Sequence, residues 1–328
     1  MNIVNYNSLY SGSAVTFDDD YVYLGIGATG KPHPKLHKLL RSNLEWVSTY
    51  EYSSDFNCSI SAIFVDGTYI YHTYEYSERG TIVKRLKSNL SLVLHSAMLP
   101  SYDYHSAAVE DDDYIYTCTF QSSTPNYFNK IRKSDLVIVN QCEFGETGIY
   151  ASGVMCKDDT YVYITANHLD HSNHIYRIRM SDAVVIDNVD WGYAPPDSVT
   201  YGTHCAVDAV NLYQCGLNSS QHGIFKGLAA DLAYQTQSEP LPPYTYYSKP
   251  MLDDDYIYVL RTAYGSSRIL QIRKSDLTTR INTDFGNLTV SFLVNEDADY
   301  FLSQITGYGI CRLNKTLNTR PRAYIIGV

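Results

Sequence analysis

Three histidines fall within one short segment of the chain, and imidazole is a common zinc ligand. His168, His171 and His174 share this segment with Asp170. Three imidazoles and a carboxylate in one loop could coordinate Zn²⁺. The segment is flanked by two predicted strands, however, so the competing interpretation is a solvated polar loop whose histidines do not converge.

Two further histidines, His105 and His204, could bind a ligand or take part in acid–base chemistry. Both are predicted to start innermost strands, with Tyr104, Tyr201 and Lys249 at nearby or equivalent places. No carboxylate or nucleophile accompanies them at a defined spacing, and the chain has no nucleophile-elbow, phosphate-loop or dinucleotide motif. We therefore expect binding rather than catalysis and no cofactor, and simple lining of a channel is the competing interpretation.

Clustered aspartates form a third candidate site, because Ca²⁺ binds carboxylate oxygens. Triplets occur at 18–20, 111–113 and 253–255, each directly before Tyr-Val-Tyr or Tyr-Ile-Tyr. Calcium loops space their ligands at alternate positions and include glycine. Consecutive aspartates point in different directions, and aspartate favours tight turns, so the pattern predicts hairpin turns rather than metal sites.

The triplets mark an internal repeat that runs through the chain. The last aromatic residue of each copy lies at 23, 71, 116, 163, 213, 258 and 301, which gives seven units. A second signature, Lys-x-Arg-Lys-Ser-Asp-Leu in the third unit, recurs in similar form with the same period. In that unit, alternation and turn residues predict strands over 106–110, 114–120, 127–132 and 136–142. Four strands in a unit of this length predict one blade of a β-propeller, with acidic and basic turns alternating at one face.

The predicted fold is all-β, a seven-bladed propeller with four antiparallel strands in each blade. A single domain is expected over 1–328, with a ring that closes near the N- and C-termini. Residues 319–326 could supply the last outer strand, and residues 1–8 could latch the last blade. The predicted blades cover approximately 9–50, 58–98, 105–143, 151–189, 201–237, 247–284 and 290–328.

The repeat resembles those of quinoprotein-like propellers of the PQQ or YVTN type. In those repeats an aspartate-rich turn leads into Tyr-Val-Tyr, matched here by 256–258, and a Lys-Ser-Asp-Leu hairpin follows, matched by 273–277. The resemblance covers nearly the whole chain and implies the fold, but such propellers include enzymes, adhesins and scaffolds. Enzymatic quinoproteins carry repeated tryptophan motifs and often adjacent cysteines, whereas this chain has only Trp46 and Trp191 and no adjacent cysteine pair.

Charge and composition exclude several classes of partner. A formal net charge of -10 and a pI near 5.4 argue against nucleic acid. No apolar run reaches the roughly 18 residues of a membrane span, and the first residues lack the features of a secretory signal. Seven cysteines without a Cys-x-x-Cys pair predict reduced thiols rather than a disulfide framework.

Tyrosine, with 32 residues, far outnumbers the other aromatic residues, and many tyrosines fall in the loops that face away from the charged turns. Rigid amphipathic rings among Ser, Gly, Asn and Pro are typical of a binding surface. Packing of these rings between blades is the competing interpretation. The candidate binding residues are Tyr102, Tyr104, His105, Tyr150, Trp191, Tyr193, Tyr201, His204, Tyr244, Tyr246 and Tyr247.

Together these features favour a non-catalytic scaffold that binds protein or glycan through its tyrosine-rich face. The hypothesis is a surface or tail-associated component of a virus or phage particle, assembled in the cytoplasm, with capsid, tail or assembly proteins or surface glycans as partners. A protein that stays in the cytoplasm is the alternative location. The alternative function is a propeller enzyme, such as a glycan lyase or hydrolase, with His105 and His204 at the mouth of the channel.

Overall fold

The computed structural model describes the strands and turns of the chain and part of its loops. The described residues are 13–26, 34–52, 58–76, 79–97, 99, 107–119, 125–145, 149–150, 155–168, 172–193, 204–218, 221–241, 246–263, 266–284, 290–295, 300–305 and 309–314. Every regular element in these ranges is a β-strand, which confirms the all-β prediction for them. No helix in the described part of the chain is long and apolar enough to cross a membrane.

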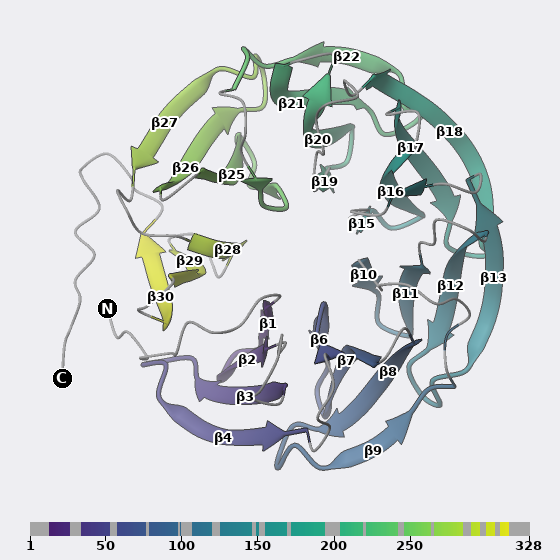
Figure 1. Ribbon diagram of the computed structural model, residues 1–328, viewed down its shortest axis with the longest axis vertical. Coiled ribbons are helices and arrows are strands. Elements are labelled where there is room, and N and C mark those ends of the chain that lie inside the picture. Colours follow the sequence, from purple (N-terminus) through teal and green to yellow (C-terminus); the bar gives the residue numbers. More distant parts are fainter. Residues whose placement is uncertain are drawn as a thin grey trace.

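Six sheets have the predicted blade topology, in which consecutive antiparallel strands run outward from the axis of a ring (Figure 1). Where two short strands share the innermost place, both pair with the second strand. The first blade contains β1 (Ser13–Phe17), β2 (Tyr21–Ile26), β3 (Lys35–Leu40) and β4 (Trp46–Glu51). The second contains β5 (Cys58–Ser59), β6 (Ile63–Val65), β7 (Tyr69–Tyr76), β8 (Arg79–Leu86) and β9 (Leu92–His95). The third contains β10 (Ala107–Glu110), β11 (Tyr114–Thr119), β12 (Asn126–Arg132) and β13 (Ile138–Phe144).

The next three blades repeat this arrangement. The fourth contains β14 (Ile149–Tyr150), β15 (Met155–Lys157), β16 (Tyr161–His168), β17 (Ser172–Arg179) and β18 (Val184–Tyr193). The fifth contains β19 (His204–Val207), β20 (Asn211–Asn218), β21 (Gln221–Leu228) and β22 (Tyr234–Gln237). The sixth contains β23 (Tyr246–Tyr247), β24 (Met251–Leu252), β25 (Tyr256–Ala263), β26 (Ser266–Arg273) and β27 (Thr279–Asp284).

The last sheet differs from the other six. Its three described strands are β28 (Val290–Asn295), β29 (Tyr300–Ile305) and β30 (Gly309–Asn314). β28 contacts β25 of the sixth blade and β1 of the first, which places this sheet between them in the ring (Figure 1). The prediction of seven four-stranded blades is therefore not met, because the structure describes six. The segments expected to supply the missing outer strand, 319–326 and 1–8, lie outside the described residues.

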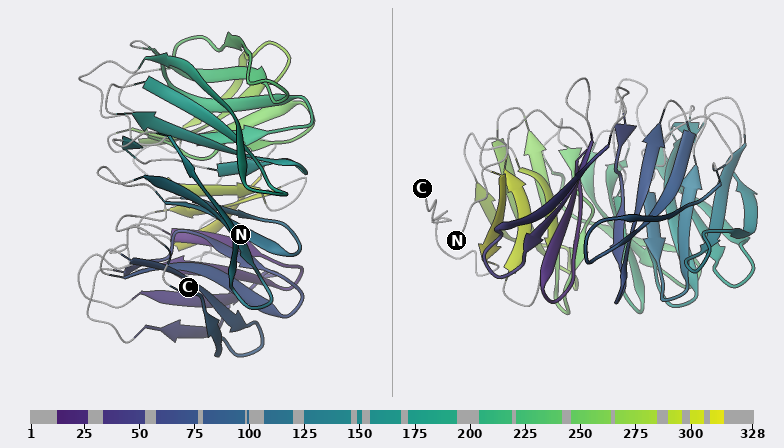
Figure 2. Two further views of the ribbon diagram at one scale, coloured as in Figure 1. Left: turned by 90° about the vertical axis from the view of Figure 1, so that its right-hand side faces the viewer. Right: turned by 90° about the horizontal axis from the view of Figure 1, so that it is seen from below.

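The two ends of the ring are built differently (Figure 2). At one end, the turn face, the chain reverses between the first and second strands and between the third and fourth strands of each blade. These turns are 18–20, 41–45, 66–68, 87–91, 111–113, 133–137, 158–160, 180–183, 208–210, 229–233, 253–255 and 274–278. The other end, the loop face, holds the connections from second to third strands and from blade to blade. Most of the loop face lies outside the described residues.

Burial follows from the position of a strand within its blade. The second strand of the first blade, β2, is buried from Val22 to Ile26, because each inner strand packs between two neighbouring blades. The outermost strand β4 alternates between exposed and half-buried residues, as expected for a strand with one face to solvent. Large apolar side chains at the start of outer strands, such as Trp46 and Leu92, are nearly half exposed.

The turn between third and fourth strands contains a residue that adopts the left-handed conformation normally favoured by glycine. At Leu136 φ is 56°, the amide donates to the carbonyl of Arg132 at 2.8 Å, and the side chain is buried. Burial of an apolar side chain offsets the backbone cost, so leucine is retained at a glycine-type position. The residues with this geometry are Leu44, Leu90, Leu136, Ala183, Leu232 and Leu277.

Candidate functional site

The first aspartate of the acidic turn uses both carboxylate oxygens in six blades. Oδ1 of Asp111 accepts hydrogen bonds from the amides of Asp113 at 3.0 Å and Tyr114 at 2.8 Å. Oδ2 accepts from the hydroxyl of Tyr116 at 2.6 Å. The same bonds are made by Asp18, Asp66, Asp158, Asp208 and Asp253. Each turn is an Asx turn anchored by a tyrosine, which confirms the prediction of hairpin turns.

The acid and the phenol of this pair keep opposite protonation states. Burial opposes ionisation of Asp111, but the bonds from Tyr116 and the two amides outweigh it, so the pKa of Asp111 lies below its ordinary value. Burial, and then the bond to the carboxylate, raise the pKa of Tyr116. Folding thus favours the carboxylate, and its contribution to stability is present above the ordinary aspartate pKa of 3.8 and is lost in stronger acid.

In each of the first five blades, a basic side chain on the third strand reaches the turn of the next blade. Nζ of Lys84 donates to the carbonyls of Lys133 at 3.0 Å and Ser134 at 3.3 Å. We call these bonds the inter-blade ladder. The equivalent donors are Lys38, Lys130, Arg177 and Lys226.

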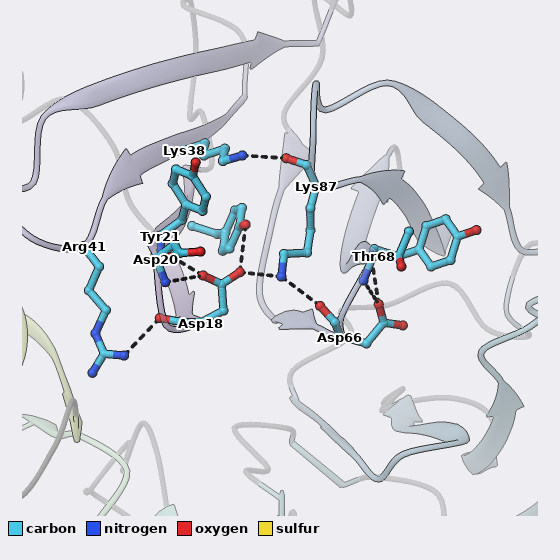
Figure 3. A network of polar contacts seen from close by, with 10 residues as sticks. Asp18, Asp20, Tyr21, Lys38, Arg41, Asp66, Thr68 and Lys87 are labelled. Atoms are coloured by element: carbon cyan, nitrogen blue, oxygen red, sulfur yellow. Dashed lines mark hydrogen bonds and ion pairs between the residues drawn. The ribbon is translucent and has the colours of Figure 1, made fainter.

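Two lysines of the basic turns, Lys87 and Lys274, form ion pairs with the preceding blade. Nζ of Lys87 in the second blade donates to the carbonyl of Asp66 at 3.0 Å and pairs with Oδ2 of Asp18 in the first blade at 2.5 Å (Figure 3). Lys274 pairs with Asp208 of the fifth blade at 3.0 Å. Acidic and basic turns therefore alternate at the turn face, as predicted, and their charges hold neighbouring blades together.

We expect Asp111→Ala to lower the free energy of unfolding by about 2 kcal/mol, because three hydrogen bonds to a charged acceptor are lost and solvent replaces only part of them. Asp112 is the neighbouring residue in the same turn and is exposed. Asp112→Ala should therefore change stability by less than about 0.5 kcal/mol. Urea denaturation followed by circular dichroism measures both values. Equal losses in the two variants would show that charge, rather than the Asx turn, is what matters.

The structure places only part of the predicted tyrosine-rich binding face. Tyr150 and Tyr193 end strands β14 and β18, and Tyr246 and Tyr247 form β23, where they pair with Thr262 and Arg261. All these positions are at strand ends toward the loop face. The predicted residues that lie outside the described ranges are Tyr102, Tyr104, His105, Tyr201 and Tyr244.

Trp191 was predicted as a binding residue, but the structure buries it between the fourth and fifth blades. Its side chain is 5% exposed, and Nε1 donates to the carbonyl of Leu232 at 2.7 Å. The ring meets that of Tyr234 edge to face at 6.2 Å and covers Gly227 of β21. Trp191 therefore packs the seam between blades, which matches the competing interpretation, and is not available to a ligand.

The predicted zinc segment forms the ends of two paired strands. His168 ends β16, His174 lies in β17 opposite Ala166, and His171 is outside the described residues. Nδ1 of His174 lies 2.7 Å from Oδ1 of Asn188. Among the described residues no group of three or more His, Cys, Asp or Glu side chains is arranged to hold a metal ion. A zinc site that includes His171 stays a prediction.

His204 lies where the sequence placed it, at the start of innermost strand β19, and its backbone pairs with Cys215. Part of the residue is exposed, but Nδ1 is buried and has no hydrogen-bond partner among the residues that the structure describes. Burial, with a smaller contribution from the charge of Lys249, lowers the pKa of His204 to about 4. The structure thus brings a neutral imidazole near a lysine ammonium group.

Sequence reasoning missed a buried arginine between the first and second blades. Arg85 is 1% exposed. Its Nε donates to the hydroxyl of Tyr52 at 3.2 Å, its Nη1 donates to the carbonyl of Leu90 at 2.9 Å, and its guanidinium carbon lies 3.5 Å from the ring centroid of Tyr50. The Tyr52 hydroxyl, the Leu90 carbonyl and the face of the Tyr50 ring together replace the water that the guanidinium group loses on burial.

A histidine completes this cluster. The hydroxyl of Tyr52 lies 2.6 Å from Nε2 of His72, and Nδ1 of His72 lies 3.1 Å from the carbonyl of Thr73. A carbonyl only accepts, so Nδ1 carries the proton and Nε2 accepts from Tyr52. Burial lowers the pKa of His72 to about 3, and the charge of Arg85 contributes in the same direction. We call Tyr52, His72 and Arg85 the seam cluster.

One sequence signal could have found the seam cluster. In the aligned repeats the position of Arg85 is occupied by aliphatic residues in four other blades, namely Leu39, Ile131, Ile178 and Ile272. All four are buried. A charged residue at a position that the fold buries predicts a compensating polar partner in the preceding blade.

Comparison with known proteins shows the fold and no family. No protein-family profile matches the chain, and no curated protein does. Among solved structures, a functionally unknown protein from Desulfotomaculum acetoxidans has a TM-score of 0.62 at 10% identity, over 94% of this chain and 96% of that chain. The chain has the β-propeller fold.

Two other propellers are similar over most of this chain. A quinoprotein alcohol dehydrogenase-like protein from Bacteroides thetaiotaomicron has a TM-score of 0.57 at 13% identity, over 84% of this chain and 66% of that chain. The dihydro-heme d1 dehydrogenase NirN has a TM-score of 0.56 at 11% identity, over 85% of this chain and 58% of that chain. At such identities the likeness concerns the fold alone, because propellers host many unrelated functions.

Proposed function

We propose that this propeller is a non-catalytic binding scaffold that engages a protein or a glycan through its loop face. The observation that carries the proposal is the contrast between the two ends of the ring. The turn face repeats the same turns, and their aspartates and lysines bond to other groups of the protein. At the loop face, by contrast, the connections differ in length and sequence from blade to blade. A rigid repeated scaffold with divergent loops at one end is a common design for binding proteins.

Variation in the loops supports this assignment. The connection between second and third strands runs over 27–34 in the first blade and 120–125 in the third, but only over 77–78 in the second and 264–265 in the sixth. Strand ends beside the connections from blade to blade carry tyrosines at 150, 193, 246 and 247. Tyrosine supplies a large contact area with few rotatable bonds, so it suits a recognition surface.

As a biological setting we propose a surface or tail-associated component of a virus or phage particle, assembled in the cytoplasm. Capsid, tail or assembly proteins and surface glycans are the partners considered. The acidic net charge of -10 supports a partner other than nucleic acid. Mass spectrometry of particles purified from the source would test the setting, since a particle component is present at a fixed copy number and a contaminant is not.

We further propose that the three-stranded sheet is a seventh blade whose outer strand comes from 319–326, from 1–8 or from both. The position of β28 between β25 and β1 supports this proposal, because a four-stranded sheet there would match its neighbours. An experimental structure of the whole chain tests it directly. A last sheet with three strands would leave the ring with six complete blades.

A glycan array, together with capture of purified particle proteins, tests the binding proposal. We expect the wild-type chain to bind at least one ligand class and the variant Tyr244→Ser, Tyr246→Ser, Tyr247→Ser to lose at least tenfold in affinity, because its aromatic contact area is removed. Tyr234→Ser is the matched control, since this tyrosine is 47% exposed on the outer strand β22. Equal binding by the triple variant would remove this patch from the proposed surface.

An enzyme such as a glycan lyase or hydrolase is the second candidate, and one observation favours it. In the described part of the chain, Nδ1 of His204 is buried without a hydrogen-bond partner, and burial, followed by the charge of Lys249, lowers the pKa of this imidazole, which favours the neutral base. Turnover of any arrayed glycan, abolished in His204→Asn and kept in His174→Asn, would replace the scaffold proposal with this one. Binding without turnover would sustain the scaffold proposal.

A further inference from the structure

Two cysteines meet at the seam between the fourth and fifth blades. Cys156 lies in β15 and Cys205 in β19, which are the innermost strands of adjacent blades and lie side by side. Their exposed fractions are 5% and 0%, and both belong to one buried cluster that also contains Trp191. The structure has them as thiols rather than as a disulfide.

The thiol of Cys205 is placed against the backbone next to Cys156. Sγ of Cys205 donates to the carbonyl of Tyr163 at 3.8 Å. Tyr163 is the residue directly opposite Cys156 in the antiparallel pair of β15 and β16. Opposed residues in such a pair have Cα atoms roughly 4.5–5.5 Å apart, so Sγ of Cys205 lies close to Cys156, and the two thiols also interact with each other.

Other cysteines with described side chains are arranged differently. Cys215 is opposite His204 on β20 and packs in a separate cluster, together with Ile257 of the sixth blade. Cys118 and Cys142 lie in the third blade on strands β11 and β13, with Phe128 of the intervening strand between them. A separation of two strands exceeds the Cα distance that a disulfide spans.

We propose that Cys156 and Cys205 are a site of oxidative modification, at which a disulfide fastens the fourth blade to the fifth. A low-molecular-weight disulfide such as oxidised glutathione is the oxidant. A Cys156 or Cys205 thiolate attacks it, one glutathione thiolate leaves, and the second protein thiolate displaces the other glutathione. Both protein thiols lose one proton and one electron, and two glutathione thiols are formed.

Burial controls when this reaction occurs. Burial raises the pKa of Cys156, and its interaction with the Cys205 thiol adds to the effect, so the thiolate is scarce in the closed seam. The disulfide therefore forms during folding or when the seam opens. Once formed, it resists reduction because it is buried. This inference does not rest on the proposed binding function.

The equilibrium of the pair with glutathione tests the inference. The full chain is denatured and reduced, then refolded in buffers with a range of reduced and oxidised glutathione, and thiols are alkylated before peptide mapping. We expect the monomer to contain one disulfide, between Cys156 and Cys205. The equilibrium constant for its formation should be roughly 30- to 1000-fold larger in the folded chain than in urea, as for a typical stabilising disulfide.

Three variants separate the outcomes. Cys156→Ala and Cys205→Ala should each abolish the disulfide, and Cys118→Ala, which removes another buried thiol, should keep it. If the cysteine variants fail to refold, the mapped wild-type peptides still decide the question. A folded wild-type chain that retains all its thiols across the buffer range, or that pairs Cys205 with Cys215, would overturn the inference.

Discussion

Gly227→Ala is expected to lower the free energy of unfolding by about 3 kcal/mol or more. A Cβ at this position would overlap Cζ2 of Trp191 and would lie 2.7 Å from its Cη2 and 2.8 Å from the carbonyl oxygen of Ala233. Neither a buried indole ring held by a hydrogen bond nor the backbone of the turn at Ala233 can yield easily, so the added methyl overpacks the seam. Urea denaturation of the variant and wild type gives the difference.

Gly223→Ala, on the same strand, is the matched control. There the nearest atoms to an added Cβ are Oγ of Ser238 at 3.4 Å and Cζ of Phe225 at 3.8 Å, which are ordinary contacts. We expect a change below about 1 kcal/mol. A second variant, Trp191→Leu combined with Gly227→Ala, should be more stable than the sum of the two single changes predicts. Additive losses would mean that the indole does not cause the overlap.

Mild acid is expected to destabilise the fold by several kcal/mol. The pKa of His72 and of His37 is lowered to about 3 from an ordinary value of 6.5, chiefly by burial. The folded chain holds both rings neutral while the unfolded chain binds protons below pH 6.5, so full stability is present above pH 6.5 and falls as pH drops toward 3. Each such histidine contributes at most about 1.4 kcal/mol per pH unit. Urea denaturation at intervals from pH 7.5 to pH 4.5 measures the slope.

His72→Gln isolates the seam cluster in this experiment. The variant loses some stability at every pH, because glutamine does not reproduce the bonds to Tyr52 and Thr73, but it cannot take up a proton. The slope of its stability against pH should therefore be smaller than that of the wild type, by the amount that corresponds to the uptake of about one proton on unfolding. Arg85 and His95 are the other charged or titratable groups that affect His72. An unchanged slope would show that His72 titrates normally in the folded chain.

The repeated elements could be predicted from the sequence because their causes are local. The turn at Asp111 is made by residues within five positions of each other, and the strands of the third blade fall within a few residues of the predicted ranges. Repetition strengthens the prediction of strands and turns, since the same sequence pattern recurs in each blade.

The repeat shows where a blade departs from the pattern but does not identify the partner residues, because these lie in another blade. The sequence indicates a loop aromatic at Trp191, because nothing near it in the sequence shows that its ring packs on Gly227 of the next blade. Arg85 stands out from the aliphatic residues of other blades, but two of its partners, Tyr50 and Tyr52, lie at the end of the preceding blade. The predicted number of four-stranded blades was wrong, because the described part of the last sheet, between β25 and β1, has three strands.

The inter-blade ladder sets the order in which the blades can form their hydrogen bonds during synthesis. Each donor precedes its acceptor along the chain, as Lys38 precedes Lys87, Lys84 precedes Lys133 and Lys130 precedes Met180. The chain is synthesised from its N-terminus, so the basic side chain of one blade cannot form its hydrogen bond until the carbonyl of the next blade has been made. Each of the first five blades therefore gains these hydrogen bonds only when the next blade has been made, and a chain that stops after one of them leaves its basic side chain without this acceptor.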